Sequence, residues 1–266
     1  MHLRVITKPP RRKSKVRDCV VTVGAFDGIH IGHRKILREV LLLAKGLKCR
    51  SLVITFDPHP LSVLEPAQAP MLLTTLEEKI KLIAEAGIDD LLIMRFTPWL
   101  AARSPEWFVK ELLVKRIGMR RLVIGYDFRF GKARGGDASY LRAAGENLGF
   151  GVDIVPPVLY RGHPVSSTRV RTAIARGEVE NASAMLGRPY ALRAKVVCGE
   201  GRGRKLDYPT ANLKPEEEKK MLPAKGVYAV QVITDAGKLL PGALYIGSKP
   251  TFGGFRVGIE VHMIGL

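Results

Sequence analysis

Short apolar strands alternate with amphipathic helices along the first two-thirds of this 266-residue chain. Strands that alternate with helices form βαβ units, whose strands run parallel. We therefore expect an open, mostly parallel α/β sheet that binds ligands at the carboxyl ends of its strands. The predicted strands are Cys19–Val23, Ser51–Phe56, Asp90–Met94, Leu122–Gly125 and Val152–Val155. The predicted helices cover Arg34–Lys45, Thr75 to about Gly87, Pro105 to Gly118 and Ala138–Leu148.

The pattern changes after about residue 185, where helical periodicity disappears. Short β-rich runs follow, separated by turn residues: ALRAKVVCG, GVYAVQVIT, GALYIG and VGIEVHMIG. The segment Thr234–Lys238, TDAGK, is a candidate hairpin turn, which favours an antiparallel sheet or barrel. Two short helices, near Thr168–Arg176 and Val179–Leu186, are expected at the joint. We predict an α/β domain over residues 1–185 and an all-β domain over residues 186–266.

The chain carries a formal net charge of +18, from 43 Lys and Arg against 25 Asp and Glu. Such an excess attracts polyanions, and nucleic acid is one candidate partner. Nucleotides and pyrophosphate are anions too, and aromatic residues make up only 7% of the chain, without a ladder for stacked bases. The charge therefore does not decide between a nucleic-acid-binding protein and an enzyme that handles phosphates.

The cysteines and the hydropathy pattern favour a cytoplasmic protein. Cys19, Cys49 and Cys198 are widely separated and lack CxxC spacing, which argues against disulfides and against a zinc site. No stretch of the sequence approaches the roughly 18 apolar residues that span a membrane. The first 18 residues are basic and lack the apolar segment of a secretory signal, so we expect a solvated leader there.

The ten residues Gly24–His33, GAFDGIHIGH, join the first predicted strand to the first predicted helix. Glycine lets a backbone approach a phosphate closely, and a helix N-terminus adds N–H donors and positive dipole potential. His30 and His33 can donate hydrogen bonds to oxygens that gain negative charge as a phosphoanhydride breaks. The alternative is a glycine-containing turn with two incidental histidines. The full pattern favours phosphate chemistry.

Three further loops carry polar or aromatic side chains beside predicted strand or helix ends. Thr55–Pro60, TFDPHP, ends the second strand, and the alternative there is a proline-stiffened turn. Gly125–Lys132, GYDFRFGK, offers two phenylalanines for stacking, or forms an aromatic-stapled loop. Val165–Arg171, VSSTRVR, is either a phosphate clamp of hydroxyls and arginines or an ordinary N-cap. The Walker A pattern GxxxxGK[ST] is absent from the sequence.

These motifs, in this order, resemble those of the bacterial bifunctional riboflavin kinase/FAD synthetases, members of the nucleotidylyltransferase superfamily. GxFDGxHxGH is similar to the family signature, TFDPHP to its second loop, GYDFRFGK to its flavin-side loop and VSSTRVR to its C-terminal nucleotide loop. The resemblance spans nearly the whole chain. It implies a Rossmann-like FMN adenylyltransferase domain at residues 1–185 and a riboflavin kinase domain, an antiparallel β-barrel, at residues 186–266.

The resemblance also implies the site residues of the first domain. His30 and His33 are expected to stabilise transition-state charge, and Asp127 to position the substrate. Asp27 is expected to have a structural or nucleotide-orienting role rather than to act as a base. The implied ATP-binding residues are Gly24, Phe26, Asp27, Gly28, Gly32, Ser166, Ser167, Thr168 and Arg171, and the implied flavin-binding residues are Pro58, His59, Asp127, Phe128 and Phe130.

In the second domain, Gly199–Leu213, GEGRGRKLDYPTANL, resembles the riboflavin-kinase module. A glycine-rich basic loop can wrap ATP phosphates, and Thr210 and Asn212 offer oxygens to Mg²⁺; the alternative is a flexible basic turn. Glu260 corresponds to the family's general base, which takes the proton of the riboflavin hydroxyl, although a strand glutamate is also a common solvated residue. The implied ATP contacts of this domain are Gly199, Gly201 and Gly203.

Two features depart from the family pattern. Asp207 stands where the family usually has glycine, which adds a carboxylate near the ATP loop. The sequence ends at MIGL, whereas the family continues with a further strand and a closing helix that shape the flavin pocket. We therefore expect either a truncated second domain or an impaired kinase.

The resulting prediction is flavin cofactor synthesis in two ATP-dependent steps with Mg²⁺, from riboflavin to FMN and from FMN to FAD. The alternatives are a nucleotidylyltransferase for another phosphorylated acceptor with an inactive barrel, and a basic nucleic-acid-binding protein. HIGH also occurs in class I aminoacyl-tRNA synthetases, but this chain is short and SSTRVR is not their lysine-rich loop. We expect small-molecule partners (ATP, riboflavin and FMN), no membrane and no nucleic acid, and the sequence leaves the oligomeric state open.

Overall fold

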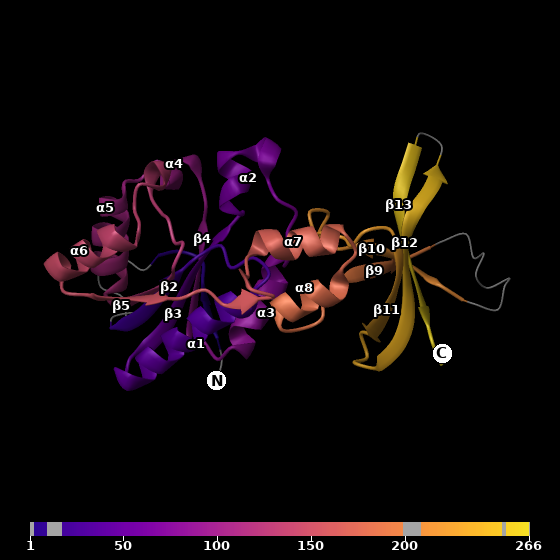
Figure 1. Ribbon diagram of the computed structural model, residues 1–266, viewed down its shortest axis with the longest axis horizontal. Helices are drawn as coiled ribbons and strands as arrows, with labels where there is room; N and C mark the ends of the chain where they lie inside the picture. Colours follow the sequence, from indigo (N-terminus) through magenta and orange to yellow (C-terminus); the bar gives the residue numbers. More distant parts are fainter. Residues whose placement is uncertain (1–2, 10–17, 199–208, 252–253, 266) are drawn as a thin grey trace. The chain divides into compact units, whose positions relative to one another are not determined.

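The computed structural model describes residues 3–9, 18–198, 209–251 and 254–265. The chain forms two compact units, Met1–Ser167 with Met185–Gly187, and Thr168–Ala184 with Arg188–Leu266. The first unit contains a six-stranded sheet in the order β1-β4-β3-β2-β5-β6 (Figure 1). Every pair in it is parallel, as the strand–helix alternation predicts. Its strands are β1 Arg4–Ile6, β2 Cys19–Val23, β3 Arg50–Asp57, β4 Asp90–Arg95, β5 Met119–Gly125 and β6 Gly151–Val155.

Helices cover both faces of this sheet (Figure 1). The α-helices are α1 Ile31–Gly46, α2 Pro60–Leu64, α3 Leu76–Glu85, α4 Pro98–Ala101, α5 Pro105–Trp107 and α6 Ala138–Leu148. A π-helix at Phe108–Ile117 continues α5, short 3₁₀ turns lie at Pro66–Gln68 and Lys132–Arg134, and β7 Leu159–Tyr160 pairs with β8 His163–Pro164. The helix expected from Pro105 to Gly118 is thus present, but most of it is wound as a π-helix.

The central strands separate two hydrophobic cores, because successive side chains of a strand point to opposite faces. In β2, Cys19 and Val21 belong to the core under the π-helix and α6, and Val20 belongs to the core under α1 and α3. Burial on both faces explains why β2 reads as a continuous apolar run, CVVTV, rather than as an alternating strand.

The strand order reverses beside β2, and this reversal positions the site. The chain leaves β2 for β3 and β4 on one side, and returns to β5 on the other side. The loops that follow β2 and β5 therefore diverge at the carboxyl edge of the sheet, the place where open α/β folds bind ligands. The loops containing GAFDGIHIGH and GYDFRFGK follow these two strands.

The expectation of a solvated leader is wrong for residues 4–6, which form β1. This strand pairs in parallel with β4, and the Arg4 guanidinium donates two hydrogen bonds to the Asp90 carboxylate, at 2.6 and 3.0 Å. Leu3 and Ile6 pack against the two cores. The strand is held by pairing with a segment far along the chain, a contact that local composition does not indicate.

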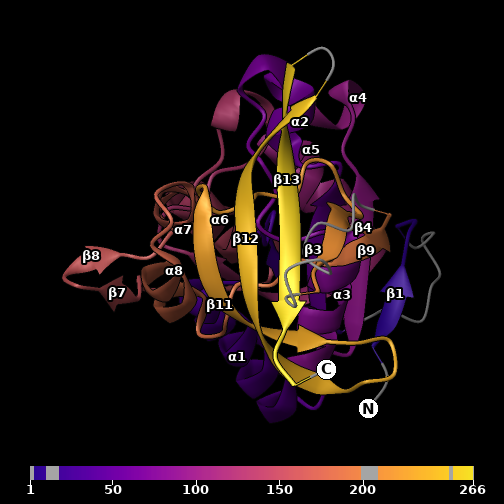
Figure 2. The same ribbon diagram turned by 90° about the vertical axis from the view of Figure 1, so that its right-hand side faces the viewer.

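The second unit contains a five-stranded antiparallel sheet in the order β11-β12-β13-β10-β9, seen face-on in Figure 2. The Thr234 amide donates to the Lys238 carbonyl at 3.0 Å, which confirms the predicted hairpin turn. Among the described residues β9 and β11 lie at opposite ends of the strand order, so the pairing forms an open sheet rather than a closed barrel. The elements are α7 Ser167–Ala175, α8 Val179–Leu186, β9 Ala194–Val197, β10 Ala211–Pro215, β11 Gly226–Ile233, β12 Leu239–Thr251 and β13 Gly254–Met263.

The described residues include no helix that is both long enough and apolar enough to cross a membrane.

Candidate active site

The histidine loop, residues 24–33, has an unusual backbone between β2 and α1. Phe26 and Ile29 have positive φ angles of 47° and 39°, although neither is glycine. A left-handed conformation costs a non-glycine residue about 1–2 kcal/mol, so the surroundings must hold this loop in place. Gly28 also has a positive φ, of 83°, and a Cβ there would lie 2.8 Å from Leu73. The positive φ therefore favours glycine at this position, and any other residue would also have to displace the Leu73 side chain.

The buried carboxylate of Asp27 ties the histidine loop to the segment before α3. Asp27 is 2% exposed. Its oxygens accept hydrogen bonds from the amides of Leu73 and Thr74 and from the Thr74 hydroxyl, at 3.0 to 3.1 Å. The Thr74 hydroxyl in turn accepts the Gly28 amide at 3.1 Å. These bonds are those of an anchor, in line with the structural role expected for Asp27, and its contact with ATP stays a prediction.

The two histidines of the loop form a stacked pair at the N-terminus of α1. Their ring centroids are 3.7 Å apart with an interplanar angle of 17°. His30 is the N-cap, and its Nδ1 accepts the His33 amide at 3.3 Å, so the proton of neutral His30 lies on Nε2. A Cβ on Gly32 would lie 3.1 Å from the His30 ring, so a side chain at this position would press on the stacked pair.

Burial lowers the pKa of His33 well below its usual 6.5, and the neighbouring His30 and Lys79 lower the pKa further. Within the described structure, the buried Nδ1 of His33 has no hydrogen-bond partner. The first turn of α1 contains no acidic residue to compete with an anion. The arrangement therefore offers a neutral His33 imidazole beside the positive end of a helix dipole, which suits a phosphate ligand.

Lys79 is a residue of this site that the sequence analysis missed. It lies on α3, is 7% exposed, and donates hydrogen bonds to the Ala25 carbonyl at 2.8 Å and to the Thr55 hydroxyl at 3.4 Å. Burial lowers the pKa of Lys79, while Asp27 and Asp57 oppose that shift. Lys79 and Ile83 are the buried residues of α3, four positions apart. A lysine on the apolar face of the predicted helix was the signal that could have revealed it.

The predicted flavin-side loop begins at the carboxyl end of β5. Asp127 is exposed, and Phe128 is half-buried with its ring stacked on Phe130 at 5.5 Å. Phe130 is 8% exposed and also contacts Phe108 and Tyr140, so its ring belongs largely to the core. Asp127 and Phe128 are thus the more accessible of the predicted flavin contacts, and all three assignments stay predictions.

The TFDPHP segment reaches the same edge of the sheet from β3. The Thr55 hydroxyl donates to the Ala25 carbonyl at 3.1 Å, which joins this strand to the histidine loop. Pro58 follows the end of β3, and His59 is the N-cap of α2, where its Nδ1 accepts the Leu61 amide at 3.2 Å. The observed role of His59 is therefore local capping, and its flavin contact stays a prediction.

The predicted nucleotide loop is divided between the two units. Ser166 and Ser167 belong to the first unit, and the Ser167 hydroxyl donates to the Asp27 carbonyl at 2.8 Å. The structure thus brings Ser167 to the histidine loop, and its contact with ATP stays a prediction. Thr168 and Arg171 lie on α7 in the second unit, and their contact with ATP stays a prediction.

The second unit brings together three residues predicted for the kinase site. Asn212 of β10 is paired in register with Glu260 of β13, and the Thr210 hydroxyl donates to Glu260 Oε2 at 3.2 Å. Oxygen donors of this kind suit Mg²⁺, which usually keeps waters and takes one or two protein ligands together with phosphates. Gly199, Gly201, Gly203 and Asp207 lie outside the described residues.

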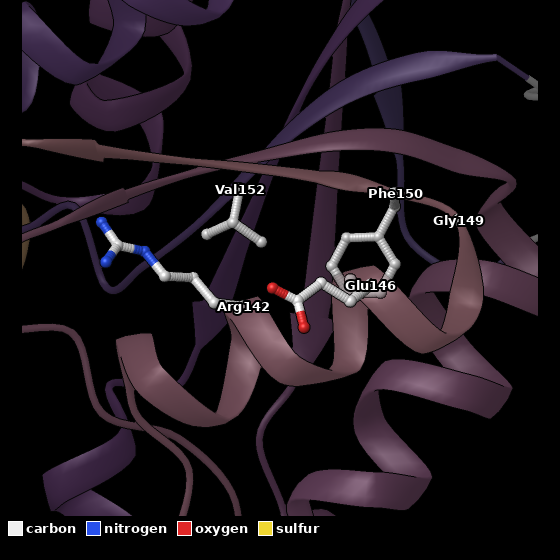
Figure 3. Close-up of a pocket in the computed structure, with 6 residues that line it drawn as sticks. Arg142, Glu146, Gly149, Phe150 and Val152 are labelled. Atoms are coloured by element: carbon white, nitrogen blue, oxygen red, sulfur yellow. The ribbon is translucent and has the colours of Figure 1, made fainter.

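A cavity of about 420 Å³ lies away from these residues, between α6 and β6 (Figure 3). Arg142, Glu146, Phe150 and Val152 are among its lining residues. It adjoins the beginning of β6, whereas the histidine loop follows the carboxyl end of β2. The cavity is thus at the opposite edge of the sheet from the predicted chemistry.

Comparison with known proteins decides the family. A family model described as FAD synthetase matches residues 12–169, and a second, described as riboflavin kinase, matches residues 186–266. The bifunctional riboflavin kinase/FMN adenylyltransferase of Escherichia coli K12 is 39% identical over 246 residues, which are 92% of this chain and 78% of the relative. This chain belongs to the bifunctional riboflavin kinase/FMN adenylyltransferase family. The resemblance stated from the motifs is therefore confirmed.

A second relative and one solved structure are also similar to this chain. The bifunctional riboflavin kinase/FMN adenylyltransferase of Haemophilus influenzae is 32% identical, over 93% of this chain and 80% of the relative. A crystal structure described as a macrolide-efflux protein from Streptococcus pneumoniae is 30% identical to this chain, with a TM-score of 0.88. The match covers 99% of this chain and 85% of the chain in that crystal structure. The region matched by the FAD synthetase model contains the histidine loop, and the region matched by the riboflavin kinase model contains Thr210 and Glu260.

Proposed function

We propose that this family member makes FAD in two steps on one chain. Residues 186–266 phosphorylate riboflavin with ATP to give FMN, and residues 1–185 transfer AMP from a second ATP to FMN, giving FAD and pyrophosphate. The family membership supports both reactions. The observation that carries the second step is the stacked pair His30–His33 at the N-terminus of α1, beside the reversal of strand order.

The adenylyl transfer needs alignment and charge stabilisation rather than a covalent intermediate. An FMN phosphate oxygen attacks the α-phosphorus of ATP; the new P–O bond forms as the bond to the β-phosphate oxygen breaks, and that electron pair leaves with pyrophosphate. His30 donates from Nε2–H to oxygens that gain charge, and the amides at the start of α1 add their dipole. We assign Ser167, whose hydroxyl donates to the Asp27 carbonyl of the histidine loop, to the same phosphates.

For the kinase step, Glu260 takes the proton of the riboflavin hydroxyl as that oxygen attacks the γ-phosphorus of ATP; the bond from the γ-phosphorus to the β-phosphate oxygen breaks, and ADP leaves with that electron pair. Thr210 orients the Glu260 carboxylate through the hydrogen bond at 3.2 Å. Mg²⁺, held with the phosphates by Thr210 and Asn212, would neutralise phosphate charge there. The three free cysteines support our placing of both reactions in the reducing cytoplasm.

The test is chromatography of the products of two separate incubations. The first mixture contains riboflavin, ATP and Mg²⁺, and in the second FMN replaces riboflavin. We expect FMN and FAD from the first mixture and FAD from the second. His30→Ala and His33→Ala should each lower FAD formation about 100-fold, because each removes a donor from the developing charge. His163→Ala changes an exposed histidine of β8 and should leave the rate unchanged. Wild-type turnover in both loop variants would remove the assignment.

A further inference from the structure

We propose that Lys79 is a positioning residue for the adenylyl transfer, because its buried ammonium group holds the histidine loop at the Ala25 carbonyl. The inference rests on the proposed function of the first unit. It assigns to α3, which carries none of the motifs, a part in arranging the reacting groups.

The contact is a closed triangle of hydrogen bonds. The Lys79 ammonium and the Thr55 hydroxyl both donate to the Ala25 carbonyl, at 2.8 and 3.1 Å, and Lys79 also donates to the Thr55 hydroxyl at 3.4 Å. The triangle joins α3, β3 and the histidine loop. Because Lys79 is only 7% exposed, its ammonium group has few alternative partners, and these bonds define its position.

The triangle acts on the histidines through one peptide unit. The Ala25 carbonyl belongs to the peptide that precedes Phe26, whose φ is 47°. The Phe26 ring then meets the His33 ring edge-on, with centroids 5.1 Å apart, and His33 stacks on His30. A rotation of the Ala25–Phe26 peptide would therefore shift both imidazoles, and small displacements of reacting groups are costly in rate.

The charge of Lys79 acts on the same ring through space. Burial lowers the pKa of His33, and His30 and Lys79 lower the pKa further. Burial lowers the pKa of Lys79, and the negative charges of Asp27 and Asp57 oppose this shift. A neutral His33 keeps the stacked pair from carrying two positive charges at 3.7 Å, which would separate the rings.

Three variants separate the hydrogen bond from the charge. Lys79→Arg keeps both a donor and a charge, Lys79→Gln keeps a donor without charge, and Lys79→Met removes both. Lys79→Met should fold, because the Thr55 hydroxyl still satisfies the Ala25 carbonyl. Lys81→Met is the matched control on α3, since the Lys81 side chain is 79% exposed and pairs with Glu85 on the same helix.

The first readout is the rate of FAD formation from FMN and ATP, with FMN formation from riboflavin as the control on the same chain. We expect Lys79→Met to lower kcat for FAD about 10- to 100-fold with little change in KM. Lys79→Gln should fall between Lys79→Met and Lys79→Arg, and Lys81→Met should match the wild type. Unchanged kcat in Lys79→Met overturns the proposal.

The second readout is the pKa of His33, from NMR titration of histidine-labelled protein. We expect Lys79→Met and Lys79→Gln to raise this pKa equally and Lys79→Arg to leave it as in the wild type. A slower Lys79→Met enzyme with a lower melting temperature and an unchanged His33 pKa shows a merely structural role and overturns the proposal. If the wild type makes no FAD at all, the proposed function fails, and the titration still decides whether Lys79 acts on His33.

Discussion

At the scale of single residues, the histidine loop shows how a site is stabilised against its own backbone strain. The positive φ angles of Phe26 and Ile29 strain the backbone of the loop. The Asp27 carboxylate stabilises the loop against this strain, because it accepts hydrogen bonds from buried amide and hydroxyl groups. The N–H and O–H groups around this carboxylate are donors, so they keep their hydrogen bonds only if the side chain at this position accepts them. The loop therefore depends on one acidic side chain that need not touch substrate.

Asp27→Asn should lower the free energy of unfolding of the first unit by about 3 kcal/mol, because an amide NH₂ would face donors. Urea unfolding followed by tryptophan fluorescence measures this, since both tryptophans, Trp99 and Trp107, lie in that unit. Asp153→Asn is the control: Asp153 pairs with Arg121 at a partly exposed site, and its loss should cost about 0.5 kcal/mol. Equal stability of the two variants would contradict the anchoring role.

The sequence predicts the members of the site that lie within one motif, and misses those joined by tertiary contact. The pattern GAFDGIHIGH places His30 and His33 at a helix start, which the structure confirms. The sequence does not show that Lys79 reaches Ala25, because the two are 54 positions apart and only the packing of α3 against β3 brings them together. The burial of Phe130 is likewise set by Phe108 and Tyr140.

At the scale of elements, Asp90 fastens three strands at one edge of the sheet. Its side chain is fully buried and receives bidentate hydrogen bonds from Arg4 of β1 and Arg50 of β3. Burial raises the pKa of Asp90, but the hydrogen bonds and charges of Arg50 and Arg4 lower it more, so the pKa lies below 3.8. The short strand β1 is thus held chiefly by this ion pair and its pairing with β4.

This shift gives a pH dependence with a defined sign. Because the folded-state pKa is depressed, the unfolded chain binds the proton first, and the stabilisation by Asp90 is present above about pH 4 and lost as pH falls through the folded-state pKa. Asp90→Asn should lower the free energy of unfolding by about 3 kcal/mol at pH 7. Urea unfolding at a series of pH values should show that difference shrinking on acidification. A difference constant between pH 7 and pH 3 would be evidence against the linkage.

Helices and strands could be predicted where their apolar pattern is local in the sequence, and not where they depend on a distant partner. A strand buried on both faces, such as Cys19–Val23, forms a continuous apolar run in the sequence. The helices that cover the sheet show apolar residues at helical spacing, because one face of each packs on a core. The strand β1 has only three residues and depends on a partner 86 positions away, so its formation is not predicted locally. The π-winding of Phe108–Ile117 is not predicted either, because π-helices are rare and an apolar face in a sequence is therefore read as that of an α-helix.

At the scale of the whole molecule, each unit has its own buried core, so we expect the two activities to be separable. In the second unit, Ile259 and Val261 are buried on either side of half-buried Glu260, which points to the other face of β13. A change at Glu260 therefore leaves that core intact, and the cores of the first unit contain no residue of β13.

Glu260→Gln should lower FMN formation about 1,000-fold through loss of the general base, and FAD formation from supplied FMN should stay at the wild-type rate. His33→Ala should show the reverse pattern, with FMN accumulating from riboflavin. Mixing the two variants should restore FAD synthesis from riboflavin, because FMN released by one chain diffuses to the other. The rate of the mixture should rise with the concentration of His33→Ala protein, since that chain supplies the FMN. Loss of both activities in Glu260→Gln, or a mixture that makes no FAD, would mean that the units do not work independently.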